Sequence, residues 1–211
     1  GKISEDLIDE SCMRILELKN KLGLFENPYK DADETKEKEV ILCKEHRDLA
    51  REAARKSFVL LKNDEKILPL GKEKKIAWIG PYVHSRNLMG AWCFIGDAKD
   101  VTNLEEAVKA QADTTNMSFH AGSPMLGSDI RLEGFGEAME QSHTPEEEET
   151  MLLEAVNAAK EADVVVLAIG EDRLQSGEAT SNANIRIPEI QQRLLERVSE
   201  VNENVVVVLF N

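Results

Sequence analysis

A glutamate stands in a stretch of small polar residues, directly after a run of apolar ones. The apolar run is "ADVVVLAIG" (162–170), and Glu178 lies in the polar stretch "SGEATSNANIRIP" (176–188). The run predicts a buried strand, and ligands of open parallel sheets gather beyond the carboxyl ends of the strands. An acid at this place is either a solvated loop residue or a catalytic group, and position alone favours the solvated residue.

A second loop has the same placement. It covers residues 81–97, follows the predicted strand "KIAWIG" (75–80), and carries His84, Arg86, Trp92 and Phe94. The first loop, 171–187, carries Glu171, Asp172 and Arg173 as well as Glu178. Long loops with acids and aromatic residues are more common at functional sites than elsewhere. Asp172 and Arg173 are the weaker candidates, because charged loop residues are usually solvated.

Other chemical signatures are missing from the sequence. It contains no CxxC, HExxH or GxxxxGK[ST] motif, and "GFGEAM" (134–139) does not complete a dinucleotide-binding motif. The four histidines lie far apart along the chain, so a metal site is not expected, and no cofactor is implied. Cys93 in the second loop could act as a nucleophile, but a packed thiol is the preferred interpretation.

Composition narrows the range of partners. The 211 residues include 40 acidic and 26 basic side chains, and the net charge of −14 disfavours nucleic acid and anionic membranes. No apolar run approaches the roughly 20 residues of a membrane span. Three widely spaced cysteines indicate reduced thiols, which favours the cytoplasm, although the chain begins with Gly1 and its compartment stays open. A homo-oligomer is compatible with the sequence.

Helical and strand-like patterns alternate along most of the chain. Helices are predicted at 4–22, 40–56, 102–111, 144–162 and 188–201, and strands at 57–63, 75–80, 117–122, 163–170 and 204–211. Strands without polar alternation, separated by helices, predict an α/β fold with a mostly parallel sheet sandwiched by helices. The last strand, "NVVVVLFN" (204–211), reads as a central strand, so we expect the sandwich to be truncated at its C-terminus.

Five stretches together resemble glycoside hydrolase family 3, which includes many β-glucosidases and β-xylosidases. They are "RILELKNKLGLFENPY" (14–29), "ARKSFVLLKNDEKILPL" (54–70), "KIAWIGP" (75–81), "MGAW" (89–92) and "SGEATSNANIRIPEIQQRLL" (176–195). The resemblance implies that residues 1–23 are the last helix of a (β/α)8 barrel, 24–39 a linker and 40–211 the first part of an α/β sandwich domain. The barrel, which would supply an aspartate nucleophile, does not appear in the sequence.

The resemblance also implies roles for individual residues. Glu178 in "SGEA" is similar to the family's general acid/base, Trp92 to an aromatic residue beside the sugar pocket, and Arg173 becomes a candidate substrate-binding residue. Asn182 stands where the family commonly has an arginine, which puts the bracing of this loop and the substrate preference in doubt. Gln191 matches a Pro-x-x-Gln helix start and is interpreted as structural.

The preferred hypothesis is part of a retaining, exo-acting β-glycosidase, with β-glucosidase favoured over other specificities. Its substrate would be a β-glucoside or oligosaccharide, and its partner the missing barrel of the same enzyme. A non-catalytic α/β carbohydrate-binding or interaction module is the alternative from another class. A nucleotide-binding Rossmann-like domain is disfavoured, because no glycine-rich first loop is present.

Overall fold

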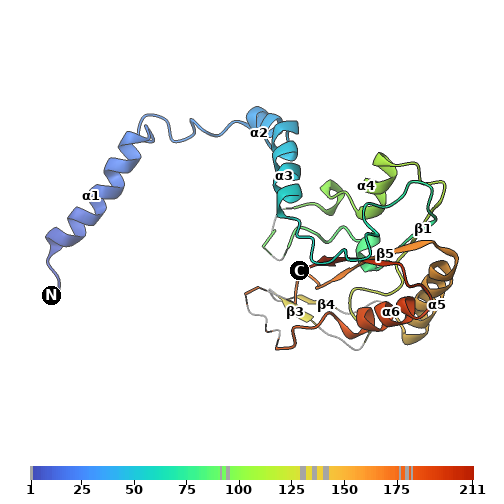
Figure 1. Ribbon diagram of the computed structural model, residues 1–211. Helices are drawn as coiled ribbons and strands as arrows, with labels where there is room; N and C mark the ends of the chain where they lie inside the picture. Colours follow the sequence, from blue (N-terminus) through green and yellow to red (C-terminus); the bar gives the residue numbers. More distant parts are fainter. Residues whose placement is uncertain are drawn as a thin grey trace. The chain divides into compact units, whose positions relative to one another are not determined.

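The computed structural model describes residues 2–90, 92–93, 96–128, 132–134, 137–139, 143–175, 177–178, 181 and 183–211. The chain divides into two units, Gly1–Lys62 and Asn63–Asn211, which are drawn together in Figure 1 and are described separately here. The domain boundaries expected from the family resemblance stay predictions.

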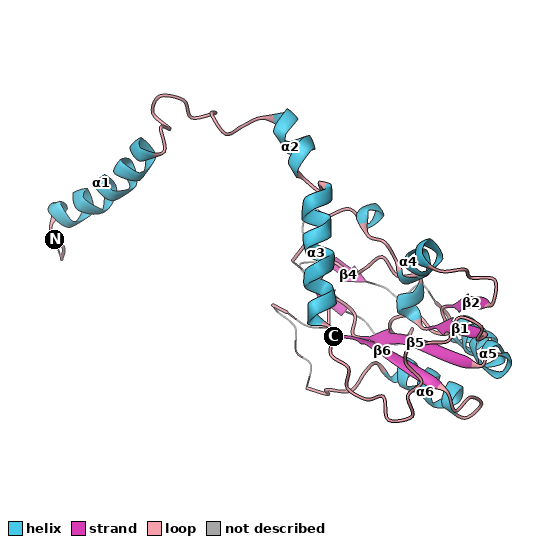
Figure 2. Ribbon diagram, turned by 45° about the horizontal axis from the view of Figure 1, so that its top comes forward, coloured by secondary structure: helices cyan, strands magenta, loops and turns pink. Residues whose placement is uncertain are grey.

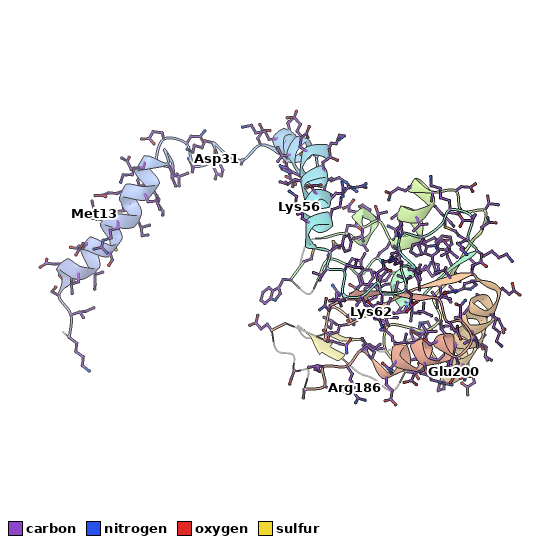
Figure 3. All side chains as sticks on the ribbon, viewed as in Figure 1. Met13, Asp31, Lys56, Lys62, Arg186 and Glu200 are labelled. Carbon is purple, nitrogen blue, oxygen red and sulfur yellow. The ribbon has the colours of Figure 1, made fainter. Side chains whose placement is uncertain are left out.

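The first unit is helical. Its helices are α1 (Glu5–Lys21), α2 (Glu34–Val40) and α3 (Lys44–Ser57). Helix α1 agrees with the predicted 4–22, and Gly23 ends it with a φ of 67°, a left-handed conformation that favours glycine. Ser4 stands at the predicted N-cap position, although its side chain makes no capping hydrogen bond. No residue of α1 is buried, and Figure 3 shows its side chains, Met13 among them, standing out from the helix.

This unit differs from the secondary structure predicted from the sequence in two places. The expected linker contains α2, because the Asp33 carboxylate accepts hydrogen bonds from the backbone N–H groups of Thr35 (2.9 Å) and Lys36 (3.3 Å) and starts a helix. The segment 57–63 is not a strand, and its residues Phe58 to Leu61 are 68–83% exposed. Hydrophobicity predicted a strand there, but a strand also needs a hydrogen-bonded neighbour.

The second unit is built on a four-stranded parallel sheet in the order β2-β1-β5-β6. The strands are β1 (Ile76–Ile79), β2 (Met117–His120), β5 (Val164–Gly170) and β6 (Val205–Phe210). Helices α4 (Leu104–Gln111), α5 (Pro145–Glu161) and α6 (Glu189–Ser199) connect them, with the short 3-10 helices η1 (Pro81–Val83) and η2 (Ala98–Asp100) after β1. Figure 2 shows the strands fanned between the helices. The predicted α/β fold is confirmed.

Helices cover both faces of this sheet. On one face, α5 and α6 pack on apolar residues of β1 and β5, and Ile79 of β1, Leu167 of β5 and Leu194 of α6 all have 0% exposure. On the other face, η1 and α4 pack near Ala168, and Trp78 stacks on Phe119 with ring centroids 6.4 Å apart. The sandwich therefore holds β1 and β5 rigidly at its centre, and the carboxyl ends of these two strands are fixed in place.

Local signals explain where the helices begin. Thr144 and Glu147 form a reciprocal capping box at α5, and Asn103 and Glu106 form another at α4. Pro188, expected in the first turn of α6, stands instead at its N-cap. A two-stranded hairpin of β3 (Leu132–Gly134) and β4 (Glu137–Met139) was not predicted, because strands of three residues carry too little pattern.

Strand β6 lies at an edge of the sheet rather than at its centre. Val207 and Leu209 are 46% and 47% exposed, although they share a sheet face with the buried Leu167 and Ile169. The apolar run predicted a strand buried on both faces, whereas within this chain the other residues of β6 are only partly buried. Among the described residues, every helix is too short or too polar to cross a lipid bilayer.

Gly80, directly after β1, packs against the backbone of Ala168 in β5, and this predicts the effect of a substitution on stability. Gly80 has a φ of 123°, and a Cβ atom there would come within 2.1 Å of the Ala168 carbonyl oxygen. We expect Gly80→Ala to lower the free energy of unfolding by about 3 kcal/mol, from backbone strain and a clash with main-chain atoms. Urea denaturation measures this value.

Gly90 provides the matched control. Its φ is 77°, but no atom lies within 4 Å of a Cβ built there, so Gly90→Ala carries backbone strain alone. Its expected loss is about 1 kcal/mol. Equal losses for the two variants would contradict the close packing at Gly80.

Candidate active site

Two loops leave the carboxyl edge of the sheet from neighbouring strands. One follows β1 and begins with η1, and the other follows β5 and runs to α6. Strands β1 and β5 pair directly, with Ile79 opposite Leu167, so the two loops start side by side. The sequence predicted a site from these same two loops, and their origins are adjacent in the structure.

Tyr82 of η1 fastens the two loops together. It is 4% exposed, its hydroxyl donates a hydrogen bond to the carbonyl oxygen of Glu171, and its ring stacks on Phe210 at 4.1 Å between centroids. Burial raises the pKa of Tyr82 to about 12, and the nearby charges of Asp172 and Glu171 add to the rise. Tyr82 is therefore a neutral, permanent donor at the root of the β5 loop.

Asp172 closes the first turn of the β5 loop. Its carboxylate accepts a hydrogen bond from the Leu174 N–H (2.9 Å) and lies 3.5 Å from the side-chain amide of Asn87 on the other loop. Its own N–H donates to the Gln175 side chain (2.8 Å), while the Gln175 N–H donates to the Asp172 carbonyl oxygen (2.9 Å). Asp172 is only 7% exposed, so the expectation of a solvated charge is wrong.

His84 and Arg86 fasten the loop after β1, residues 81–97, to helix α4. The His84 Nδ1 atom lies 2.9 Å from a carboxylate oxygen of Glu105. The Arg86 guanidinium donates to the carbonyl oxygen of Val101 and to the Glu106 carboxylate. The Lys109 ammonium, with a smaller contribution from His84, lowers the pKa of Glu105, which stays ionised. His84 and Arg86 thus have structural partners within the chain.

The three predicted site residues lie on these two loops. Glu178 is exposed and follows Gly177, whose φ is 111°. Trp92 on the loop after β1 is 57% exposed, and Arg173 is partly buried in the turn that Asp172 closes. Phe94 and Asn182, also singled out from the sequence, lie outside the described residues. Within the described part of the chain, no group of three His, Cys, Asp or Glu residues is placed to hold a metal ion.

Comparison with known proteins decides the family. Residues 58–211 match the family model described as the glycosyl hydrolase family 3 C-terminal domain. The chain belongs to glycoside hydrolase family 3. The resemblance seen in the sequence is thereby confirmed, and the α/β sandwich described above is this family's C-terminal domain.

Individual family 3 relatives span the whole chain. A periplasmic β-glucosidase of Salmonella typhimurium is 35% identical over 100% of the chain, which covers 28% of that protein. A β-xylosidase of Formosa agariphila is 32% identical over 97% of the chain, covering 26% of that protein. The crystal structure of a Listeria innocua β-glucosidase in complex with isofagomine superposes over 100% of the chain and 26% of its own, with a TM-score of 0.78 and 39% identity. The chain spans about a quarter of the length of these relatives.

Sequence reasoning found the two loops but not the contacts that fix them. Tyr82 was not singled out, because a tyrosine after a strand is an ordinary core residue in a sequence. Gln191 was interpreted as a structural residue at a helix start, and its full burial agrees with this, but its hydrogen-bond partners were not foreseen. A buried glutamine is unusual and always needs hydrogen-bond partners, but burial of a polar residue is invisible without the fold.

Tyr82 generates a pH-dependent prediction. Its pKa is raised from about 10 in the unfolded chain to about 12 in the fold. The folded state therefore favours the neutral phenol, and this stabilisation is complete below pH 10 and lost as the pH rises through 12. We expect Tyr82→Phe to lower the free energy of unfolding by about 1–2 kcal/mol at neutral pH, because the Glu171 carbonyl oxygen loses its donor, and to lack this alkaline loss.

Urea denaturation between about pH 8 and pH 12 measures both effects. Tyr29→Phe is the matched control, because Tyr29 is 78% exposed and is the only other tyrosine of the chain. The same alkaline loss of stability in the wild type and in Tyr82→Phe would show that Tyr82 does not carry it.

Proposed function

We propose that this chain forms the acid/base-bearing part of a retaining, exo-acting β-glycosidase that hydrolyses terminal non-reducing β-D-glucosyl residues. The observation that carries the proposal is the position of Glu178. It is exposed, and it lies on a loop whose first turn is fixed at the carboxyl edge of a parallel sheet. A rigid root with an accessible carboxyl group suits a proton donor that must reach a substrate held by another domain.

The reaction needs two carboxyl groups about 5 Å apart on opposite sides of the glycosidic bond. An aspartate of a (β/α)8 barrel, which is not among these 211 residues, would attack the anomeric carbon. Glu178 would donate its proton to the departing oxygen and later take a proton from the water that releases the sugar. An acid in this role works near neutral pH when burial and a neighbouring carboxylate raise its pKa.

Trp92 and Arg173 are proposed to bind the substrate. Sugars present apolar C–H faces, and an indole that is 57% exposed offers a flat surface on which they can stack. Arg173 lies five residues before Glu178 on the same loop, where its guanidinium could donate hydrogen bonds to sugar hydroxyls.

The helix α1 is proposed to be the last helix of the barrel, with residues 24–39 as the linker and 40–211 as the sandwich domain. Helix α1 carries an apolar face with no buried residue, as expected for a helix that packs on a barrel. An open apolar groove runs along this face, lined by Ile3, Leu7, Ile8, Ser11, Cys12, Ile15 and Leu16.

The choice of glucose is part of the proposal. The Salmonella relative and the Listeria structure are named as β-glucosidases, which favours it, whereas the Formosa relative is named as a β-xylosidase. The compartment also stays a prediction, because the sequence favours the cytoplasm and the Salmonella protein is named as periplasmic.

The division of the two carboxyl groups predicts that the 211-residue chain alone is inactive. Without a nucleophile, it should release no nitrophenol from p-nitrophenyl β-D-glucoside or β-D-xyloside, as followed by absorbance. The full-length protein that carries the barrel should hydrolyse the glucoside faster than the xyloside. Turnover that follows the isolated chain through purification would contradict the proposal.

Glu178→Ala in the full-length protein tests the proton donor. For an alkyl β-D-glucoside, kcat/KM should fall by about 10²–10⁴-fold, the usual contribution of general acid catalysis. The loss should be much smaller for dinitrophenyl β-D-glucoside, whose leaving group needs no proton. Azide should partly restore turnover of the activated substrate by attacking the glycosyl-enzyme directly.

Glu189→Ala provides the matched control, because Glu189 is an exposed carboxylate at the start of α6. It should leave both substrates unaffected. A Glu178→Ala enzyme with wild-type rates on the alkyl glucoside would remove Glu178 from the proposed role.

A further inference from the structure

We propose that Gln191 is a positioning residue for the general acid, because its side chain ties together the two ends of the loop that carries Glu178. The inference rests on the role proposed for Glu178. It assigns to a buried glutamine of helix α6 a measurable effect on proton donation, in addition to its place in the core.

The oxygen and both N–H groups of the Gln191 side-chain amide are hydrogen-bonded. Its Oε1 atom accepts from the Gly170 N–H (2.8 Å), and its Nε2 atom donates to the carbonyl oxygens of Gly170 (2.9 Å) and Met125 (2.7 Å). A primary amide has one acceptor oxygen and two N–H donors, and all are used here. Gln191 is 0% exposed, so water cannot replace these bonds.

The two ends of the loop meet at this amide. Gly170 is the last residue of β5 and the point from which the loop departs. Gln191 lies in the first turn of α6, where the chain returns to the sheet after the loop. One side chain therefore closes the segment 171–188 at its base, and the bond to Met125 joins the loop after β2 to the same point.

Gly170 packs closely against the end of strand β6. Its φ is 156°, and a Cβ atom there would lie 1.9 Å from the carbonyl oxygen of Phe210. The next residue, Glu171, donates its N–H to the same Phe210 oxygen (3.0 Å). The direction in which the loop leaves the sheet thus depends on the backbone of Gly170, and Gln191 holds both polar groups of that backbone.

A positioning role and a merely structural role predict different kinetics. Loss of folded protein lowers the rate for every substrate by the same factor. Displacement of a general acid slows only those substrates whose leaving group needs a proton, and a shift of about 1 Å can cost 10²-fold. The ratio of the rates for a poor and a good leaving group therefore separates the two roles.

The experiment uses the full-length protein with Gln191→Met, which keeps the size of the side chain and removes its hydrogen bonds. Methyl β-D-glucoside and dinitrophenyl β-D-glucoside serve as the poor and the activated substrate. We expect kcat/KM to fall by about 10–100-fold for the methyl glucoside and by less than about 3-fold for the dinitrophenyl glucoside. Gln191→Glu, which keeps the shape and the acceptor for the Gly170 N–H, provides the same comparison if the Met variant does not fold.

Gln192→Met is the matched control. Within the described part of the chain, the Gln192 side-chain amide donates a hydrogen bond to Glu196 on the surface of α6 (2.9 Å) and forms none with the loop. It should leave the substrate ratio unchanged. Equal losses for both substrates in the Gln191 variants, or no loss at all, would overturn the inference. Glu178→Ala is measured in parallel: if it shows no leaving-group dependence, the proposed function fails, and if it does while the Gln191 variants do not, only the positioning role fails.

Discussion

The backbone of Gly170 is the point on which the arrangement of the loops depends. Its N–H and carbonyl groups are both bound by the buried Gln191 amide, and its α-carbon lies too close to Phe210 to carry a side chain. Buried peptide groups require hydrogen-bond partners, and the strand β5 ends here, so an amide side chain takes over where the sheet no longer supplies them. The hydrogen bonds of Gln191 therefore fix the start of the loop relative to the sheet.

The first turn of the β5 loop is held by hydrogen bonds to backbone atoms. Tyr82 donates to the Glu171 carbonyl oxygen, and Asp172 accepts from the Leu174 N–H. Bonds of this kind depend little on salt, whereas the exposed pairs elsewhere on the chain contribute little to stability. The loops of the candidate site therefore have roots that are set by the fold, and they carry Glu178 and Trp92 with exposed side chains.

Much of the fold could be predicted from the sequence, and the misses share one cause. Helix α5 was predicted at 144–162 and found at Pro145–Glu161, because its apolar period and its Thr144 cap are local signals. The segment 57–63 and the buried charge of Asp172 were misjudged, because each depends on what lies beside it in space. Likewise, Glu178 could be selected from the family resemblance, whereas the roles of Tyr82 and Gln191 needed the three-dimensional arrangement.

The two tryptophans sit in contrasting surroundings. Trp78 stacks on Phe119 within the sandwich, whereas the indole of Trp92 is 57% exposed on a loop of the candidate site. The chain therefore contains two intrinsic fluorophores that differ in solvent exposure. Acrylamide quenching distinguishes them, so that one emission component reports the integrity of the sheet and the other reports changes in the exposure of the loop, without any added dye.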